Sequence, residues 1–116
     1  MYTIRKTLSV SAAHSLNLTY ESKCEQVHGH NWKIATTVAG NELNEDGMLM
    51  DFSHIKKLVN SKFDHSNLNN FMEQPTAENI CKYIFDSLSK HLEGSGIFCV
   101  KIEVEESEGS YASYEI

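Results

Sequence analysis

The sequence predicts an α+β fold, in which an antiparallel four-stranded sheet has two helices packed on one face. Apolar and polar residues alternate near both ends of the chain, whereas apolar residues recur at helical spacing in the middle. The resulting order is strand, strand, helix, helix, strand, strand. A chain of 116 residues without repeats or linker-like stretches fits one domain over residues 1–116.

The first two predicted strands flank a polar loop. Residues 2–12 alternate, which places one apolar set on a common face: Tyr2, Ile4, Leu8, Val10 and Ala12. Residues 17–26 are polar and are expected to form a loop. A second strand is expected over residues 28–39, with Trp32, Ile34 and Val38 on one face.

Two helices are predicted in the middle of the chain. Asp51 can cap the first, which has an apolar stripe of Phe52, Ile55, Leu58, Val59 and Phe63. Residues 64–74 are polar and are expected to be irregular. Thr76 can cap the second helix, which has an inner stripe of Ala77, Ile80, Ile84, Leu88, His91 and Leu92.

A third strand is predicted over residues 97–106 and a fourth after the turn at Gly109. The expected inward face of the third strand consists of Phe98, Val100, Ile102 and Val104. Glu106 continues this apolar phase. A carboxylate on a buried face needs a partner, which a ligand with a donor edge would provide; the alternative is a frayed or bulged strand with a solvated Glu106.

The composition excludes several classes of function. A net charge of -6 argues against a general nucleic-acid or acidic-membrane surface, and no stretch approaches the roughly 18 to 20 apolar residues that span a bilayer. The N-terminus lacks the features of a signal peptide, and three cysteines do not suggest a disulfide framework. A cytoplasmic protein without a nucleic-acid or membrane partner is therefore expected.

Three histidines form the sharpest local pattern. His28 and His30 point to the same side of the second strand, and His14 follows the first strand on its inward phase. If the two strands pair as a hairpin, the three imidazoles lie close together. Three neutral imidazoles with an open fourth position are typical of catalytic zinc, whereas the alternative is three ordinary histidines in polar crevices.

Two further groups could take part in chemistry. Cys24 could be a fourth metal ligand, a small buried residue or a reactive thiol, whereas Cys81 and Cys99 have no polar motif around them. The adjacent Asp64 and His65 could transfer protons near neutral pH, although such pairs are also common in loops.

Six motifs in order resemble the 6-pyruvoyl-tetrahydropterin synthase family over almost the whole chain. They are Ser11-Ala12-Ala13-His14, Cys24-x3-His28-Gly29-His30, Gly47-Met48-Leu49-Met50-Asp51-Phe52, Asp64-His65-Ser66-Asn67-Leu68-Asn69, Pro75-Thr76-Ala77-Glu78-Asn79 and Val104-Glu105-Glu106-Ser107. Two positions depart from the family pattern: Phe63 replaces a leucine, and Ser107 replaces a threonine.

The resemblance implies a fold, a cofactor and roles for individual residues. The fold is the tunnelling fold, in which small α+β subunits join their sheets into an oligomeric barrel with active sites at subunit interfaces. Zn²⁺ is expected on His14, His28 and His30, and Cys24 occupies the catalytic cysteine position. Further roles are implied for Asp64 and His65, an acid–base pair from a neighbouring subunit, for Glu106, the pterin anchor, and for Thr76 and Glu78, which line the pterin pocket.

The spacing of Cys24 and His28 resembles the 6-carboxy-tetrahydropterin synthase branch, which serves queuosine and other deazapurine synthesis. The resemblance then implies conversion of 7,8-dihydroneopterin triphosphate to 6-carboxy-tetrahydropterin with loss of triphosphate and acetaldehyde. Two alternatives remain: a 6-pyruvoyl product formed by triphosphate elimination alone, and a zinc- or pterin-binding module without turnover. Arg5, Lys23 and Lys33 are candidate phosphate-binding residues by charge alone.

Overall fold

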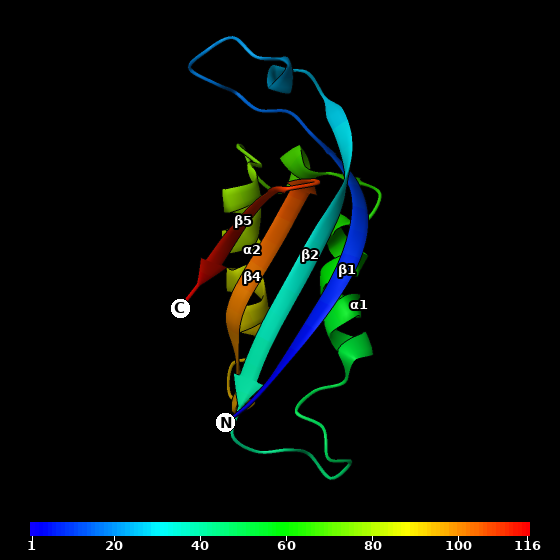
Figure 1. Cartoon of the computed structure of the whole chain (residues 1–116), viewed down its shortest axis with the longest axis vertical. Helices are drawn as coiled ribbons and strands as arrows, with labels where there is room; N and C mark the ends of the chain where they lie inside the picture. The colour runs from blue at the N-terminus through cyan, green and yellow to red at the C-terminus, as the bar shows by residue number, and fades with distance from the viewer.

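One twisted sheet with two helices on one face makes up the molecule (Figure 1). The structure is a computed structural model that describes all of residues 1–116. The strands are β1 (Tyr2–His14), β2 (His28–Gly40), β3 (Ser66–Asn67), β4 (Ile97–Ser107) and β5 (Ser110–Glu115), and their order in the sheet is β3-β1-β2-β4-β5. The helices are α1 (Phe52–Phe63) and α2 (Ala77–His91), with short 3-10 turns η1 (Lys23–Glu25) and η2 (Leu68–Asn70).

The expected four-stranded antiparallel sheet is wrong in one respect, because the sheet is mixed and has five strands. The additional strand, β3, pairs in parallel with Ala12 and Ala13 of β1. It lies in the polar segment 64–74 that was expected to be irregular. A pairing of two residues is too short to produce an alternating pattern, so the sequence contains no signal for it.

Caps and apolar stripes explain where the helices form. The Asp51 side chain accepts a hydrogen bond from the Ser53 amide at the start of α1, and the Thr76 side chain accepts one from the Asn79 amide at the start of α2. α1 packs against β1, whereas α2 packs against β4 and β5. Neither helix has the length and apolar composition that a membrane-spanning helix needs.

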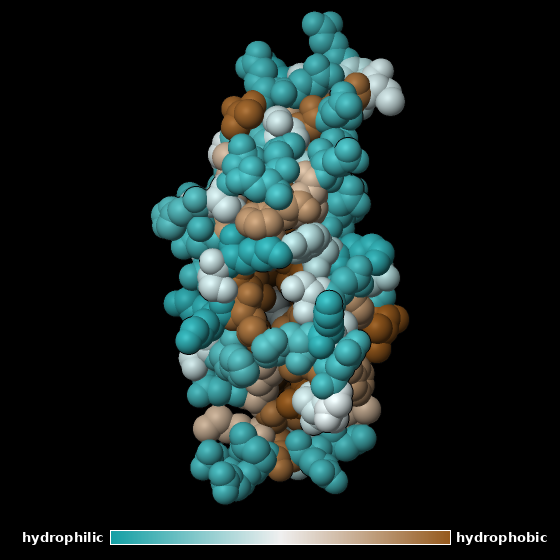
Figure 2. Space-filling model, turned by 180° about the vertical axis from the view of Figure 1, so that it is seen from behind, coloured by the Kyte–Doolittle hydropathy of each residue, from teal (hydrophilic) through white to brown (hydrophobic).

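The core lies between the helices and the sheet. It is built from most of the predicted stripes, with Trp32, Ile34, Ile55, Ile80 and Ile102 each at most 2 % exposed. Two predicted members of the helix stripes lie outside it, because Phe52 and His91 stand at helix ends and are exposed. Figure 2 shows the helix side of the molecule, where hydrophilic side chains cover most of the surface. Apolar side chains remain visible in the groove between α1 and α2, whose lining includes Val59, Phe63 and Leu88.

A β-bulge corrects the predicted face of β4. Val38 pairs with Cys99 and Thr37 pairs with Lys101, so Val100 has no partner on β2. The extra residue reverses the alternation of side chains, so that Cys99 is buried while Phe98 is 38 % exposed. The prediction that Phe98 and Val100 share the buried face with Ile102 and Val104 is therefore wrong.

Candidate active site

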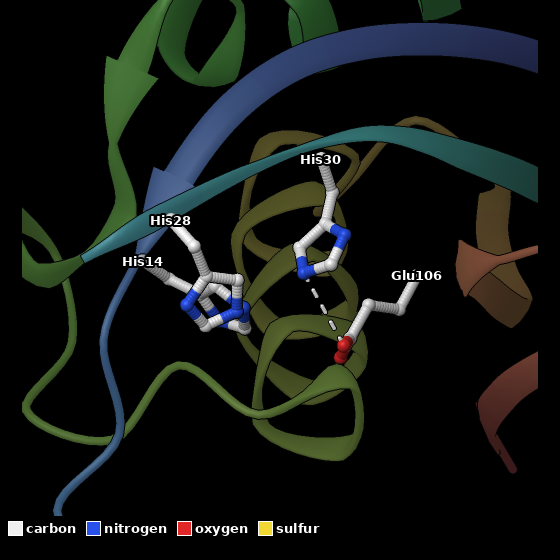
Figure 3. Close-up of side chains that lie close together, drawn as sticks. All are labelled: His14, His28, His30 and Glu106. Atoms are coloured by element: carbon white, nitrogen blue, oxygen red, sulfur yellow. Dashed lines mark ion pairs between the residues drawn. The ribbon is translucent and has the colours of Figure 1, made fainter. Parts of the chain in front are cut away.

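Three histidines converge at one end of the β1–β2 hairpin. His14 ends β1 directly opposite His28, which begins β2, and His30 pairs with Ala12. Their ring centroids are 4.5 to 5.2 Å apart. Each offers a nitrogen that, together with a carboxylate oxygen of Glu106, belongs to a group of ligand atoms within 4.8 Å of one another (Figure 3). The hairpin register thus brings together the three histidines that the sequence pattern singled out.

Backbone carbonyls set the orientation of two of these rings. His14 Nδ1 lies 2.8 Å from the Pro75 carbonyl oxygen, and His28 Nδ1 lies 2.7 Å from the Gln26 carbonyl oxygen. A carbonyl only accepts hydrogen bonds, so each Nδ1 carries the hydrogen and each Nε2 presents a lone pair. A hydrogen-bonded Nδ1 of this kind is the usual support for a histidine that binds metal through Nε2.

The donor set fits a metal cation. His14 Nε2 and His30 Nε2 are buried and have no hydrogen-bond partner in the chain. Buried polar atoms without partners are costly, and a cation bound by the imidazoles would satisfy them. Zinc is suited to imidazole ligands, so the residues present fit a zinc ion.

His14 is the most deeply buried member of the group, with no exposed surface. Burial lowers its pKa from the ordinary value of 6.5, and the neighbouring His28 and His30 lower it further, while the Pro75 carbonyl and Glu106 act in the opposite direction. A lowered pKa keeps the ring neutral near pH 7. A neutral imidazole is the form that binds a metal.

Trp32 forms one wall of the histidine group. Its ring meets those of His14 and His30 edge to face, with centroids 4.8 and 5.1 Å apart. Its Nε1 donates a 3.1 Å hydrogen bond to the Ala12 carbonyl. The sequence did not predict the contacts of Trp32 or those of the Pro75 and Gln26 carbonyls. It indicated only that Trp32 lies on the same strand face as the histidines.

Glu106 reaches the same site from β4. Glu105 pairs with Tyr111 and Ser107 pairs with Ser110, so Glu106 is the extra residue of a second bulge. Its Oε1 lies 3.3 Å from His30 Nε2 (Figure 3), although the two are not aligned as a hydrogen bond. Bulges often re-aim a side chain beside a functional site, and here the carboxylate turns toward the histidines.

The residues predicted to line a pterin pocket lie at the start of α2. Glu78 shares a surface depression with Glu106, and Ser107 and Tyr111 also line it. Thr76 uses its hydroxyl oxygen to cap α2, accepting a 3.1 Å hydrogen bond from the Asn79 amide. Its hydroxyl proton remains available as a donor.

Cys24 lies outside the group of candidate ligand atoms. It sits in η1, on the loop between β1 and β2, and is half-buried. The other two cysteines are buried, and burial raises the pKa of both the Cys81 and the Cys99 thiol to about 11. Cys24 is therefore the one cysteine with an accessible side chain.

The structure does not bring Asp64 and His65 into the histidine group. Asp64 ends α1 and accepts a 2.9 Å hydrogen bond from the Ser11 amide. His65 adopts a positive φ of 59°, and its side chain is 82 % exposed and lies 3.5 Å from Asp64. His65 borders a surface depression that Ser11, Gly29, His30 and Asn31 of the β1–β2 hairpin also line.

Two of the three candidate phosphate-binding cations are paired within the chain. Arg5 Nε lies 3.1 Å from Glu103, and Lys33 Nζ lies 3.9 Å from Glu105. By strand alternation they lie on the sheet face that the helices leave bare, opposite the histidines. Lys23 lies beside Cys24 in η1.

Comparisons with known proteins identify the family. The family model described as 6-pyruvoyl tetrahydropterin synthase matches residues 3–116. The 6-carboxy-5,6,7,8-tetrahydropterin synthase of Bacillus subtilis is 34% identical over 97% of this chain and 84% of its own, and the dihydroneopterin monophosphate aldolase of Pyrococcus furiosus is 37% identical over 74% of each chain. The structure of Caenorhabditis elegans 6-pyruvoyl tetrahydropterin synthase matches with a TM-score of 0.77 at 29% identity, covering 99% of this chain and 95% of that one.

The family model and the Caenorhabditis elegans structure match nearly the whole chain, one in sequence and the other in fold. The relatives named as 6-carboxy-5,6,7,8-tetrahydropterin synthases place the chain among enzymes of that kind. The chain belongs to the 6-pyruvoyl tetrahydropterin synthase family.

Proposed function

We propose that this enzyme converts 7,8-dihydroneopterin triphosphate to 6-carboxy-5,6,7,8-tetrahydropterin, with release of triphosphate and acetaldehyde, in queuosine or related deazapurine synthesis. The observation that carries the proposal is the convergence of three imidazoles and the Glu106 carboxylate within 4.8 Å. The identity to the Bacillus subtilis 6-carboxy-5,6,7,8-tetrahydropterin synthase supports this choice of reaction.

Zinc is the proposed cofactor, held by His14, His28 and His30. When bound, it would supply Lewis acidity that makes the hydroxyl groups and adjacent C–H of the substrate side chain more acidic. The Pro75 and Gln26 carbonyls hold His14 and His28 with Nε2 free for this purpose.

Glu106 is proposed to fix the pterin ring. An ionised carboxylate only accepts hydrogen bonds, which matches the N–H groups along one edge of a pterin. Thr76 and Glu78 extend the same surface from α2, with a free hydroxyl donor and a second carboxylate. Holding the ring in one orientation contributes to catalysis by positioning.

The proton transfers are assigned to Cys24, Asp64 and His65. The Cys24 thiolate removes a proton from the substrate side chain, and His65, oriented by Asp64, exchanges a proton on the opposite side. Triphosphate leaves by elimination, which leaves two adjacent carbonyl groups on the side chain. Water then adds to the carbonyl carbon next to the ring, and cleavage of the bond between the two carbonyl carbons leaves the carboxyl group on the pterin and releases acetaldehyde. Because His65 is exposed and outside the histidine group of its own chain, we propose that it serves the site of a neighbouring copy in a homo-oligomeric barrel.

Product analysis tests the reaction directly. The purified, zinc-loaded protein is incubated with 7,8-dihydroneopterin triphosphate, and the products are identified by mass spectrometry. The proposal predicts 6-carboxy-tetrahydropterin and acetaldehyde. A 6-pyruvoyl product without carbon–carbon cleavage would contradict the assigned branch and the inference from the Cys24–His28 spacing.

Two controls separate the remaining alternatives. Incubation with 7,8-dihydroneopterin monophosphate detects the aldolase reaction for which the Pyrococcus furiosus relative is named. Unchanged substrates in the presence of bound zinc would instead support a binding module without turnover.

A further inference from the structure

Two amide side chains hold the segment that follows β1. Asn69 Oδ1 accepts a 2.8 Å hydrogen bond from the Ser15 amide, and Asn69 Nδ2 donates a 3.0 Å bond to the Ser15 carbonyl. Gln74 does the same to Asn17, accepting at 2.8 Å and donating at 2.9 Å. Each side chain therefore binds both backbone polar groups of one residue.

These side-chain hydrogen bonds resemble those that a neighbouring strand would make with residues 15–17. In an antiparallel sheet, alternate residues exchange both an N–H and a C=O bond with the same neighbour, and the residue between them points its backbone groups the other way. Ser15 and Asn17 are such alternate residues. β1 itself ends at His14, so Asn69 and Gln74 continue its pairing beyond the end of the sheet.

Leu16, which lies between Ser15 and Asn17, contacts the backbone of Cys24. We call the pair Asn69 and Gln74, which bind Ser15 and Asn17, the clamp. The Leu16 amide donates a 2.7 Å hydrogen bond to the Cys24 carbonyl. Leu16 thus faces η1 on one side of the segment while its neighbours are held on the other. The chain of contacts runs from Asn69 and Gln74, through residues 15–17, to the backbone of Cys24.

Both clamping residues are themselves held in place. The Asn67 side chain accepts a hydrogen bond from the Asn69 amide at 3.0 Å, and the Gln74 carbonyl accepts one from Asn79 Nδ2 at 2.8 Å. The following residue, Pro75, holds His14 through its carbonyl. One segment therefore contacts the base of the Cys24 loop and a candidate metal ligand together.

We propose that Asn69 and Gln74 are positioning residues that set the place of Cys24 relative to the three histidines. The inference rests on the proposed role of Cys24 as the base. It requires amide chemistry, because each position needs one donor and one acceptor on the same side chain. The Asn69 pair is more buried than the Gln74 pair, so Asn69 is expected to have the larger effect.

The test compares Asn69→Asp and Gln74→Glu, singly and together, with the wild-type protein. Each variant keeps the size and the acceptor but replaces the donor with an oxygen that faces a carbonyl. Asn70→Ala, an exposed neighbour, is the matched control. Zinc content, hydrogen exchange at the Leu16 amide, Cys24 alkylation by iodoacetamide, and kcat and KM are measured on each protein.

The double variant is expected to keep zinc, to exchange the Leu16 amide about tenfold faster and to lose about 10- to 100-fold in kcat, the range caused by small misplacements of reacting groups. KM should change by less than about threefold, because positioning affects chemistry more than binding. Alkylation reports Cys24 selectively, because the other two thiols are buried.

Three results would overturn the inference. An unchanged kcat in the double variant, unchanged Leu16 exchange, or a raised KM at constant kcat would each do so, the last by indicating direct substrate binding. If the double variant does not fold, the inference is tested with Asn69→Asp and Gln74→Glu separately, by the same three criteria. If the wild-type protein shows no turnover, the proposed function fails, yet the exchange and alkylation measurements still decide whether the clamp positions Cys24.

Discussion

The histidine group and the Asp64–His65 pair contrast sharply, although both lie close to the same end of β1. His14 is fully buried, and its ring is in contact with three aromatic rings and one backbone carbonyl. His65 is 82 % exposed and contacts only the adjacent carboxylate among charged side chains. A single chain supplies all three histidines of the candidate metal site. The same chain holds the Asp64–His65 pair at its surface, outside that site.

This difference indicates which parts of the proposed mechanism are local and which depend on assembly. A buried group with convergent nitrogen atoms needs only the ion to be complete. His65 has a left-handed backbone conformation, which costs free energy in a residue other than glycine. Such conformations cluster at functional sites. The pair is therefore suited to act on something brought against the surface.

The largest effect, loss of the metal together with activity, is expected from His28→Ala. Removal of one of three imidazoles should abolish zinc binding and lower kcat/KM by more than about 100-fold, beyond the range typical of residues that only support ligands. Zinc content and activity should fall together. His54→Ala, an exposed histidine of α1, is the control that should keep both. Retention of zinc by His28→Ala would exclude the three-histidine site.

A mixing experiment tests whether the acid–base pair acts between chains. Cys24→Ala and His65→Ala should each keep zinc but lose about 10²- to 10⁴-fold in kcat, as expected for loss of a general base or acid. Co-refolding the two inactive proteins should restore activity, because some sites then combine an intact Cys24 with an intact His65 from another chain. No recovery would place both residues in the same chain's reaction, and loss of zinc in Cys24→Ala would make Cys24 a ligand.

The lowered pKa of His14 predicts how the metal-free protein responds to acid. The unfolded chain takes up a proton on this residue near pH 6.5, whereas the folded chain does so only at lower pH. The unfolded state then binds more protons, so the free energy of unfolding should decrease as the pH falls below about 6.5. Thermal unfolding of chelator-treated protein at pH 7.5 and 5.5 measures this decrease. His14→Gln should show a smaller one, and an equal decrease would assign it to other groups.

The smallest effect is expected at the cap of α2. Thr76→Ala should lower the free energy of unfolding by about 1 kcal/mol, because the Asn79 amide loses its acceptor, and Thr76→Ser should restore most of it. Urea unfolding measures the difference. If Thr76 also donates to the pterin, the alanine variant should raise KM in addition, and an unchanged KM would limit this residue to capping.

Periodicity predicted both helices and the strands β1, β2 and β4, because each contributes several apolar residues to one core. The short β5 was predicted from the turn at Gly109 and contributes only Ala112, which packs against the core. Periodicity failed at Val100, where a single extra residue reverses the inward face of β4, and residue types do not reveal such a bulge. It also missed β3, which pairs over two residues only.

The candidate site was predictable to a similar degree. His14, His28 and His30 share a strand phase, so their convergence follows from alternation once the hairpin forms. The supports provided by Pro75 and Gln26 could not be predicted, since a backbone carbonyl has no residue-specific signature. Asn69 and Gln74 bond to backbone groups as well, and their partners become known only when segments 54 residues or more apart are folded together.

The direct pairing of His14 with His28 has a consequence for how such enzymes can change. The sheet register closes the loop of residues 15–27 at its base, so insertions between Asn17 and Ser22 would leave the imidazoles where they are. Doubling the length of a flexible loop costs only about 0.6 kcal/mol of closure entropy. Evolution or a protein engineer could therefore lengthen or exchange the tip of this loop without rebuilding the group of three histidines.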